Sequence, residues 1–184
     1  MICSLCLFCG FLVTEKASAK KTTVKKVSSA LKNGTFTVSG KGKMPESAMP
    51  KVAQKKKIKK IVIKNGVTEL PEDAFRDCSK ATVITIAPTV NRIGAMAFYN
   101  TGVEKISIPD EVKYIRENAF NSLLSSTSQK FSIRSVVLNN NIETLPKYAF
   151  AGNKEIKVYT NKEIMIQRYT FDNCGEYEII RLTH

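Results

Sequence analysis

One pattern recurs along this chain about every 22 residues, and it restricts the fold more than any other feature. In its first copy, Ile61 to Cys78 (IVIKNGVTELPEDAFRDC), apolar residues stand at i, i+2, i+6 and i+9, ahead of an Ala-Phe pair. The Phe of this pair recurs with spacings of 23, 22 and 30 residues, at Phe75, Phe98, Phe120 and Phe150. A fifth, degenerate copy contains Thr170-Phe171. Repetition at a fixed period of this length predicts a solenoid in which each copy forms one coil.

The spacing within a copy predicts how each coil is built. Two apolar residues at i and i+2 predict a short strand with one face turned inward. A single coil cannot bury its apolar residues alone, so the coils must stack, with their strands in a parallel sheet along one side. The side chains expected inside are Ile58, Ile61, Ile63, Val67, Leu70, Ala74 and Phe75 in the first coil, Ala81, Ile84, Ile86, Val90, Ile93, Ala97 and Phe98 in the second, Val103, Ile106, Ile108, Val112, Ile115, Ala119 and Phe120 in the third, and Ile133, Val136, Leu138, Ile142, Leu145, Ala149 and Phe150 in the fourth.

The first 19 residues have the pattern of a secretory signal peptide. Ile2 to Val13 is an apolar run of twelve residues, shorter than the roughly 20 residues that a membrane-spanning helix needs. Ala17-Ser18-Ala19 follows, with small residues where a signal peptidase cleaves. A buried core helix or a tail anchor is the alternative interpretation. The prediction is a secreted protein that does not span the membrane.

The segments around the repeats predict two ends of different kinds. Residues 20–33 are expected to form a flexible basic leader. Residues 34–57 are expected to form a cap, because Phe36 and Val38 alternate with polar residues between glycines, as in a strand. Such a strand would cover the apolar end of the first coil. The repeats occupy residues 58–176, and residues 177–184 include a closing strand (YEIIRL). A Ser-rich loop follows Phe120 and accounts for the longest repeat spacing.

Cys78 and Cys174 each follow a repeat Phe by three residues. Coils lie about 4.8 Å apart if their strands pair, so four coils separate the two thiols by roughly 19 Å. A disulfide needs Cα atoms within about 7 Å. We therefore expect both residues to be unpaired and to fill space in the turns of the coils.

The repeat resembles a known bacterial pattern, L-x-x-I-x-I-x-x-x-V-x-x-I-x-x-x-A-F-x-x-C. The first copy matches it with Ile58 at the leading position, and the second and third copies lack its Cys. This is similar to the BspA-type leucine-rich repeat of bacterial surface proteins, and Gly34 to Pro45 (GTFTVSGKGKMP) is similar to the cap segment of such proteins from Gram-positive bacteria. The resemblance implies a leucine-rich-repeat solenoid of the β-rich α/β class. It would be a right-handed coil of about five repeats with a short parallel sheet on one side and an N-terminal strand cap. Known members include surface adhesins, which implies a location at the bacterial cell surface.

The composition argues against catalysis. The only histidine is His184, the last residue, and Ser-His-Asp or Cys-His catalysis requires a positioned imidazole. Acidic pairs such as Glu72/Asp73 and Asp110/Glu111 fall in turns, where carboxylates are usually only solvated, and a glycan hydrolase that uses them is the weaker alternative. Zinc and calcium signatures are absent from the sequence. We predict a protein that is not an enzyme and has no cofactor.

The positive charge is concentrated at one end. The net charge is +13, and residues 20–64 contain fourteen lysines and one acidic residue, whereas residues 65–184 are neutral. A basic patch of Lys55, Lys56, Lys57 and Lys59 fits an anionic cell-wall polymer. The alternative is a solvated segment that keeps the protein soluble. No aromatic residues alternate with these lysines, so nucleic acid is not an expected partner.

The outward face of the predicted sheet is the second candidate surface. It presents Val62, Thr85, Ser107 and Val137 between the buried strand residues, flanked by Lys60, Val83, Lys105 and Ser135. Extended rows of small and apolar residues are typical of a binding face on a solenoid. β-branched residues that only favour strand formation are the alternative. The sequence predicts a secreted adhesion module that binds a protein or glycan here, or alternatively a wall-associated spacer held by its basic end.

Overall fold

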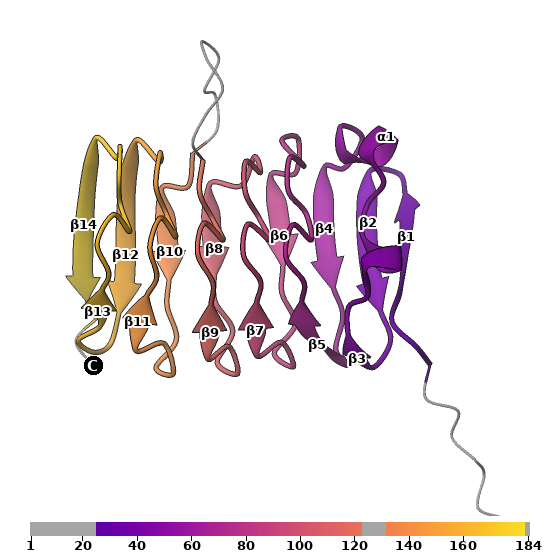
Figure 1. The fold of residues 1–184 in the computed structure, drawn as a ribbon, viewed down its shortest axis with the longest axis horizontal. Coiled ribbons are helices and arrows are strands. Elements are labelled where there is room, and N and C mark those ends of the chain that lie inside the picture. Colours follow the sequence, from indigo (N-terminus) through magenta and orange to yellow (C-terminus); the bar gives the residue numbers. More distant parts are fainter. Residues whose placement is uncertain (1–24, 123–131, 183–184) are drawn as a thin grey trace, which may run out of the picture.

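The computed structural model describes residues 25–122 and 132–182, which stack into a solenoid of β-strands with little helix (Figure 1). The predicted signal peptide, the first residues of the basic leader and most of the Ser-rich loop lie outside the described residues. The predicted solenoid, with parallel strands stacked along one side, is confirmed.

The longer strands form the main sheet, which consists of two half-sheets. In the first half-sheet, β1 (Ser28–Lys32) pairs antiparallel with β2 (Thr35–Ser39), and β4 (Lys60–Ile63) and β6 (Val83–Thr85) continue parallel to β2. The second half-sheet contains β8 (Lys105–Ser107), β10 (Ser135–Val137), β12 (Glu155–Thr160) and β14 (Glu176–Arg181), all parallel. The closing strand predicted after residue 176 corresponds to β14.

Short strands line another side of each coil. They are β3 (Gly42–Lys43), β5 (Val67–Leu70), β7 (Arg92–Ile93) and β9 (Tyr114–Ile115), joined in one ladder, and β11 (Thr144–Leu145) and β13 (Met165–Ile166), joined in another. Within residues 25–122 and 132–182 the helices are one 3-10 turn, η1 (Glu46–Ala48), and one α-helical turn, α1 (Val52–Lys55), both beside the first coil. The repeat thus builds two parallel ladders per coil, where the sequence pattern predicted one.

The N-terminal strand cap is confirmed, with Phe36 and Val38 of β2 buried against the first coil. The basic leader, predicted for residues 20–33 as a flexible segment, is wrong in its second half, because Ser28–Lys32 forms β1. The cause is the Asn33-Gly34 turn, whose residues both have positive φ (49° and 76°). Asn-Gly is the preferred pair for a two-residue hairpin turn, and it folds β1 back along β2 despite its polar composition.

An aromatic stack runs through the centre of the solenoid. The rings of the repeat phenylalanines are stacked with centroids 5.4 Å apart in three successive pairs, from Phe75 through Phe98 and Phe120 to Phe150. Phe36 meets the stack edge-on at one end, and Phe171 with Tyr177 continues it at the other. Such contacts add about 0.5–1.5 kcal/mol per pair beyond the burial of apolar area. The stack joins every coil to its neighbours.

The second coil is less well covered than predicted. Ile84 and Ile86, expected in the core, are only partly buried. In the described part of the chain no strand pairing joins β6 to β8, so the main sheet is interrupted between the second and third coils. Because β6 lacks a neighbour on that side, its inward side chains stay partly accessible.

Each coil turns sharply just before its phenylalanine. The residue two places earlier is left-handed in all five coils, with φ between 52° and 66°, at Asp73, Met96, Asn118, Tyr148 and Tyr169. Asp and Asn tolerate this conformation, whereas Met and Tyr adopt it rarely. The turn is stabilised by backbone hydrogen bonds to the next coil, such as Phe75 N–H to Ala97 O (2.7 Å) and Phe98 N–H to Ala119 O (2.8 Å).

One buried amide bridges the two sides of the long insertion. The Asn153 side chain is 0% exposed. Its Oδ1 accepts hydrogen bonds from the Ile133 N–H (2.7 Å) and the Ser122 hydroxyl (2.9 Å), which flank the insertion. Its Nδ2 donates to the carbonyls of Phe150 (2.7 Å) and Phe120 (3.3 Å). Asn153 thereby connects the end of the third coil to the start of the fourth.

Candidate binding surface

The outward side chains of the main sheet form two rows, called here the outer rows, that cross the coils in register. The first row contains Thr37, Val62 and Thr85 on the first half-sheet, and Ser107, Val137, Tyr159 and Ile180 on the second. The second row contains Thr35, Lys60 and Val83, and then Lys105, Ser135, Lys157 and Glu178. Parallel pairing places equivalent residues of successive coils side by side, which is why the repeat produces rows that are continuous within each half-sheet.

All eight residues predicted for this face lie in the outer rows. Six are exposed, and Val62 and Ser135 are half-buried. The structure brings them together within each half-sheet, whereas the interruption between β6 and β8 separates Thr85 from Ser107. Their position is therefore as predicted, and their binding of a partner stays a prediction.

The sequence pattern missed the ends of the rows. Tyr159 was not predicted because the strand of the fifth copy is displaced by one residue relative to the repeat, and Ile180 was not predicted because it lies in the closing strand β14 after the last copy. The alternation in β12 was the available signal, since Ile156 and Val158 are buried while Glu155 and Lys157 are exposed. A period-2 pattern identifies the outward residues even where the repeat alignment fails.

The two rows differ in chemistry. The first row carries no charge, and Val137 remains 39% exposed in it. The second row contains three lysines, of which Lys157 is paired with Glu178 (Nζ to Oε2, 3.3 Å). Val83, 47% exposed, adds apolar surface to the second row. The surface therefore combines an uncharged strip with a parallel line of cations.

The sequence of these coils matches a described repeat type. A family model, the BspA type leucine-rich repeat region, matches residues 52–178 with six copies. The chain belongs to the BspA-type leucine-rich repeat family. The match contains six copies, where the sequence pattern predicted about five repeats; in the structure β14 adds one more strand in register with β12.

Two solved structures of leucine-rich repeat proteins are similar to this chain, and the first of them supports the fold. A leucine-rich repeat protein from Eubacterium ventriosum has 22% sequence identity and a TM-score of 0.69, and the match covers 84% of this chain and 42% of that one. A leucine-rich repeat protein from Bacteroides ovatus has 20% identity and a TM-score of 0.48, covering 86% and 53%. The present chain thus spans about half the length of these relatives or less. No curated protein matches it significantly.

The predicted basic patch of this BspA-type protein is accessible. Lys56, Lys57 and Lys59 are exposed and Lys55 is half-buried, in and after α1 at the N-terminal end of the stack. Among the described residues, the side chains of these four lysines make no ion pair. Their charges are therefore available to an anionic partner.

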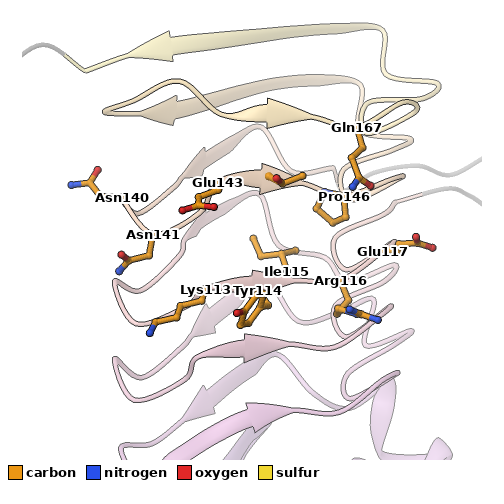
Figure 2. Close-up of a pocket in the computed structure, with 11 residues that line it drawn as sticks. Lys113, Tyr114, Ile115, Arg116, Glu117, Asn140, Asn141, Glu143, Pro146 and Gln167 are labelled. Atoms are coloured by element: carbon orange, nitrogen blue, oxygen red, sulfur yellow. The ribbon is translucent and has the colours of Figure 1, made fainter.

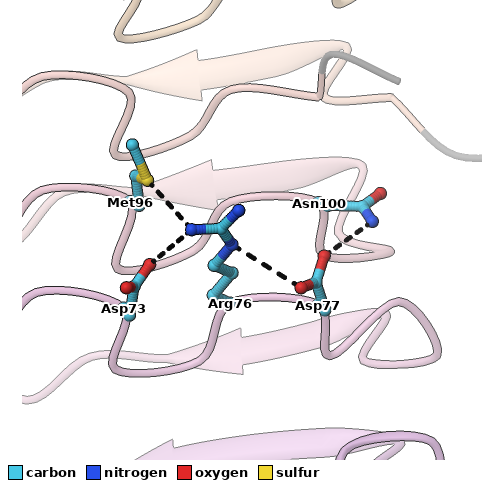
Figure 3. A network of polar contacts seen from close by, with 5 residues as sticks. All are labelled: Asp73, Arg76, Asp77, Met96 and Asn100. Atoms are coloured by element: carbon cyan, nitrogen blue, oxygen red, sulfur yellow. Dashed lines mark hydrogen bonds and ion pairs between the residues drawn. The ribbon is translucent and has the colours of Figure 1, made fainter. Parts of the chain in front are cut away.

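A polar network missed by the sequence analysis covers the turns of the first two coils (Figure 3). Arg76 lies between Asp73 (3.3 Å) and Asp77 (3.6 Å), and Asn100 donates a hydrogen bond to Asp77 (2.9 Å). The Arg76 guanidinium also lies 5.0 Å from the centre of the Tyr99 ring. The network ties adjacent turns together, because Arg76 contacts two carboxylates of its own turn and the Tyr99 ring of the next, and Asn100 of that next turn donates to Asp77.

The two cysteines of the repeat turns are unpaired, as predicted. Burial raises the pKa of the Cys78 thiol to about 12, and burial also raises the pKa of Cys174. The Cys174 Sγ donates to the Phe150 carbonyl at 3.3 Å. Neither thiol is a reactive nucleophile at neutral pH, because the thiolate is the reactive form.

The described ranges, 25–122 and 132–182, contain no cluster of three or more His, Cys, Asp and Glu side chains suited to a metal ion. The same ranges contain no helix long and apolar enough to cross a membrane.

Proposed function

We propose that this BspA-type protein is an extracellular binding module that holds a partner protein on the outer rows of its main sheet. The observation that carries the proposal is the uncharged first row, which is in register within each half-sheet and exposes Thr85, Ser107 and Val137. Leucine-rich repeats typically serve as non-enzymatic protein-interaction modules, and BspA-type repeats are typical of cell-surface proteins. Export would depend on residues 1–19, whose composition is that of a signal peptide.

The test is capture of a partner by the immobilised protein at low and high salt. We expect one protein to be retained at high salt, because apolar contacts are not screened by ions. The double variant Thr85→Glu/Ser107→Glu places two charges in the first row and should abolish capture. The control Asn65→Glu/Asn91→Glu adds the same charges at exposed positions away from the sheet and should leave capture unchanged. Equal capture by both variants would refute the proposal.

A second candidate function rests on the exposed basic patch. In it the protein associates with an anionic cell-wall polymer through Lys56, Lys57 and Lys59, and the repeats act as a spacer. The variant with all three lysines changed to Glu should then lose binding to purified cell walls at low salt. The outer-row variant should retain this binding, so one set of proteins separates the two functions. Capture that involves only anionic polymer and disappears at high salt would favour the spacer.

A further inference from the structure

The ladder of short strands is interrupted between β9 and β11. In the described part of the chain no pairing joins these two strands, although β7 pairs with β9 and β11 with β13. After β7, β9 and β13 the next residue donates its N–H to the preceding coil at 3.0 Å, from Gly94 to Leu70 O, from Arg116 to Ile93 O and from Gln167 to Leu145 O. Pro146 holds this position in the fourth coil and has no N–H to donate. Pro71 holds it after β5, where the ladder stays paired, so Pro146 removes one bond at the opening and does not open the ladder by itself.

The opening is a depression of about 570 Å³ (Figure 2). It extends along the strands from Lys113 and Asn141 at one end to Pro146, Arg116 and Gln167 at the other, with Tyr114 between them. Small-molecule sites generally have volumes of about 300–1,000 Å³. The depression has the size of a ligand site, and it lies on the short-strand side of the solenoid, away from the outer rows.

The four charged side chains around the depression sum to zero net charge, and none of them is paired with a described residue. Lys113 and Arg116 supply two positive charges, and Glu117 and Glu143 supply two negative ones. Among the described residues these four side chains have no ion pair and no hydrogen bond. Some other charged side chains are paired, as in the Arg76 network. Planar guanidinium and carboxylate groups present several donors and acceptors in one plane, and the zero net charge favours a neutral, hydroxyl-rich ligand over an anion.

Tyr114 supplies an aromatic face at the centre of the depression. Its side chain is 57% exposed. The Arg92 guanidinium lies 5.3 Å from the centre of the ring, and Arg92 belongs to β7, on the side of β9 opposite to the depression. Arg92 thus holds the Tyr114 ring from one side, and the other side of the ring, toward β11, borders the depression. The electron-rich face of an aromatic ring attracts polarised C–H groups, which line one side of a pyranose.

We propose that the depression between β9 and β11 is a binding site for a neutral saccharide, which stacks on Tyr114 and accepts and donates hydrogen bonds through Arg116, Glu117 and Glu143. The unpaired edges of β9 and β11 offer further backbone donors and acceptors for hydroxyl groups. An extended peptide added to these edges is the competing occupant. The peptide is less favoured because side chains with free hydrogen-bonding groups surround the edges. This site is separate from the outer rows, so it can succeed or fail independently of the proposed protein partner.

The test measures binding of a panel of neutral disaccharides built from hexoses and N-acetylhexosamines, with sulfated sugars and an extended peptide library in parallel. We expect saturable, salt-insensitive binding of a neutral sugar. Tyr114→Ala should weaken it at least about tenfold, and Glu143→Gln by a smaller factor. Tyr177→Ala is the control for loss of an equally exposed ring (57%), and circular dichroism checks its fold because the Tyr177 ring stacks on Phe171. The outer-row variant Thr85→Glu/Ser107→Glu is the second control, and both controls should bind the sugar normally.

Pro146→Ala tests whether the gap between β9 and β11 is needed for binding, and it removes none of the proposed stacking or hydrogen-bonding groups. The new N–H can donate to the Ile115 carbonyl and narrow the opening, so sugar affinity should fall. Undiminished affinity in this variant would overturn the assignment to the opening. Binding of sulfated sugars only, binding of peptide only, sugar binding that survives Tyr114→Ala, or the absence of saturable sugar binding would each overturn the proposal.

Discussion

Replacement of Asn153 by Ala tests whether one buried amide connects the third and fourth coils across the long insertion. The change removes four hydrogen bonds, to Ile133, Ser122, Phe120 and Phe150. It leaves the backbone geometry of the turn intact, because Ala is compatible with the same backbone conformation. Any loss of stability therefore reports on the hydrogen bonds and the small cavity.

The expected magnitude follows from these contacts. The buried N–H of Ile133 loses its acceptor at 2.7 Å, and an unsatisfied buried donor costs about 1–3 kcal/mol. The Phe150 carbonyl keeps a weak donor, the Cys174 thiol at 3.3 Å, so its loss is smaller. Each remaining net hydrogen bond contributes about 1 kcal/mol. The free energy of unfolding should fall by about 3–5 kcal/mol in total.

The assay is urea unfolding followed by circular dichroism, with Asn153→Thr as the matched control. Thr101 occupies the corresponding place in the second coil and donates to the Phe98 carbonyl at 3.0 Å. Thr at position 153 should recover the bond to Phe150 and not the one from Ile133, so it should be about 1 kcal/mol more stable than the Ala variant. An Ala variant within about 0.5 kcal/mol of the parent would refute this account of the connection.

Two further predictions concern the core. Phe98→Ala removes a ring stacked on both sides, so the free energy of unfolding should fall by about 3–5 kcal/mol. The same change at the terminal, partly buried Phe171 should lower it by less. Equal losses of the two variants in urea unfolding would contradict the stack. Because the pKa of Cys78 is raised to about 12 from 9.0, the folded protein keeps this proton while the unfolded chain loses it, so stability should fall as the pH rises from 9 toward 12. Cys78→Ala should show a shallower fall between pH 8 and 10, and identical slopes would show that the thiol is not linked to folding.

The interior of each coil was predictable because a single side-chain requirement repeats. Every complete copy must supply a large ring to the centre, and Phe75, Phe98, Phe120 and Phe150 are all buried. The outer rows followed directly, since a strand with known inward residues has known outward ones. The fifth copy escaped the alignment because its strand is displaced by one residue, and Tyr159 was missed with it.

Features that depend on pairing between coils were less predictable. Pro146 is visible in the sequence, yet its effect arises only when the facing Ile115 carbonyl is identified. The left-handed turn residues include Met96 and Tyr148, whose residue types do not favour positive φ, so the tertiary hydrogen bonds of the turn override local preference. β1 was overlooked because its polar composition outweighed the Asn33-Gly34 signal.

The two interruptions in the ladders are staggered around the third coil. Where the main sheet is open, between β6 and β8, the pairing of β7 with β9 and the turn bond from Phe98 to Ala119 keep the second and third coils together. Where the short ladder is open, between β9 and β11, the third and fourth coils are held together by the pairing of β8 with β10 and by the turn bond from Phe120 to Ala149. Because the two interruptions fall at different coil boundaries, neither boundary loses both ladders. Each interrupted boundary between described coils therefore stays connected through the other ladder and through the turn bonds.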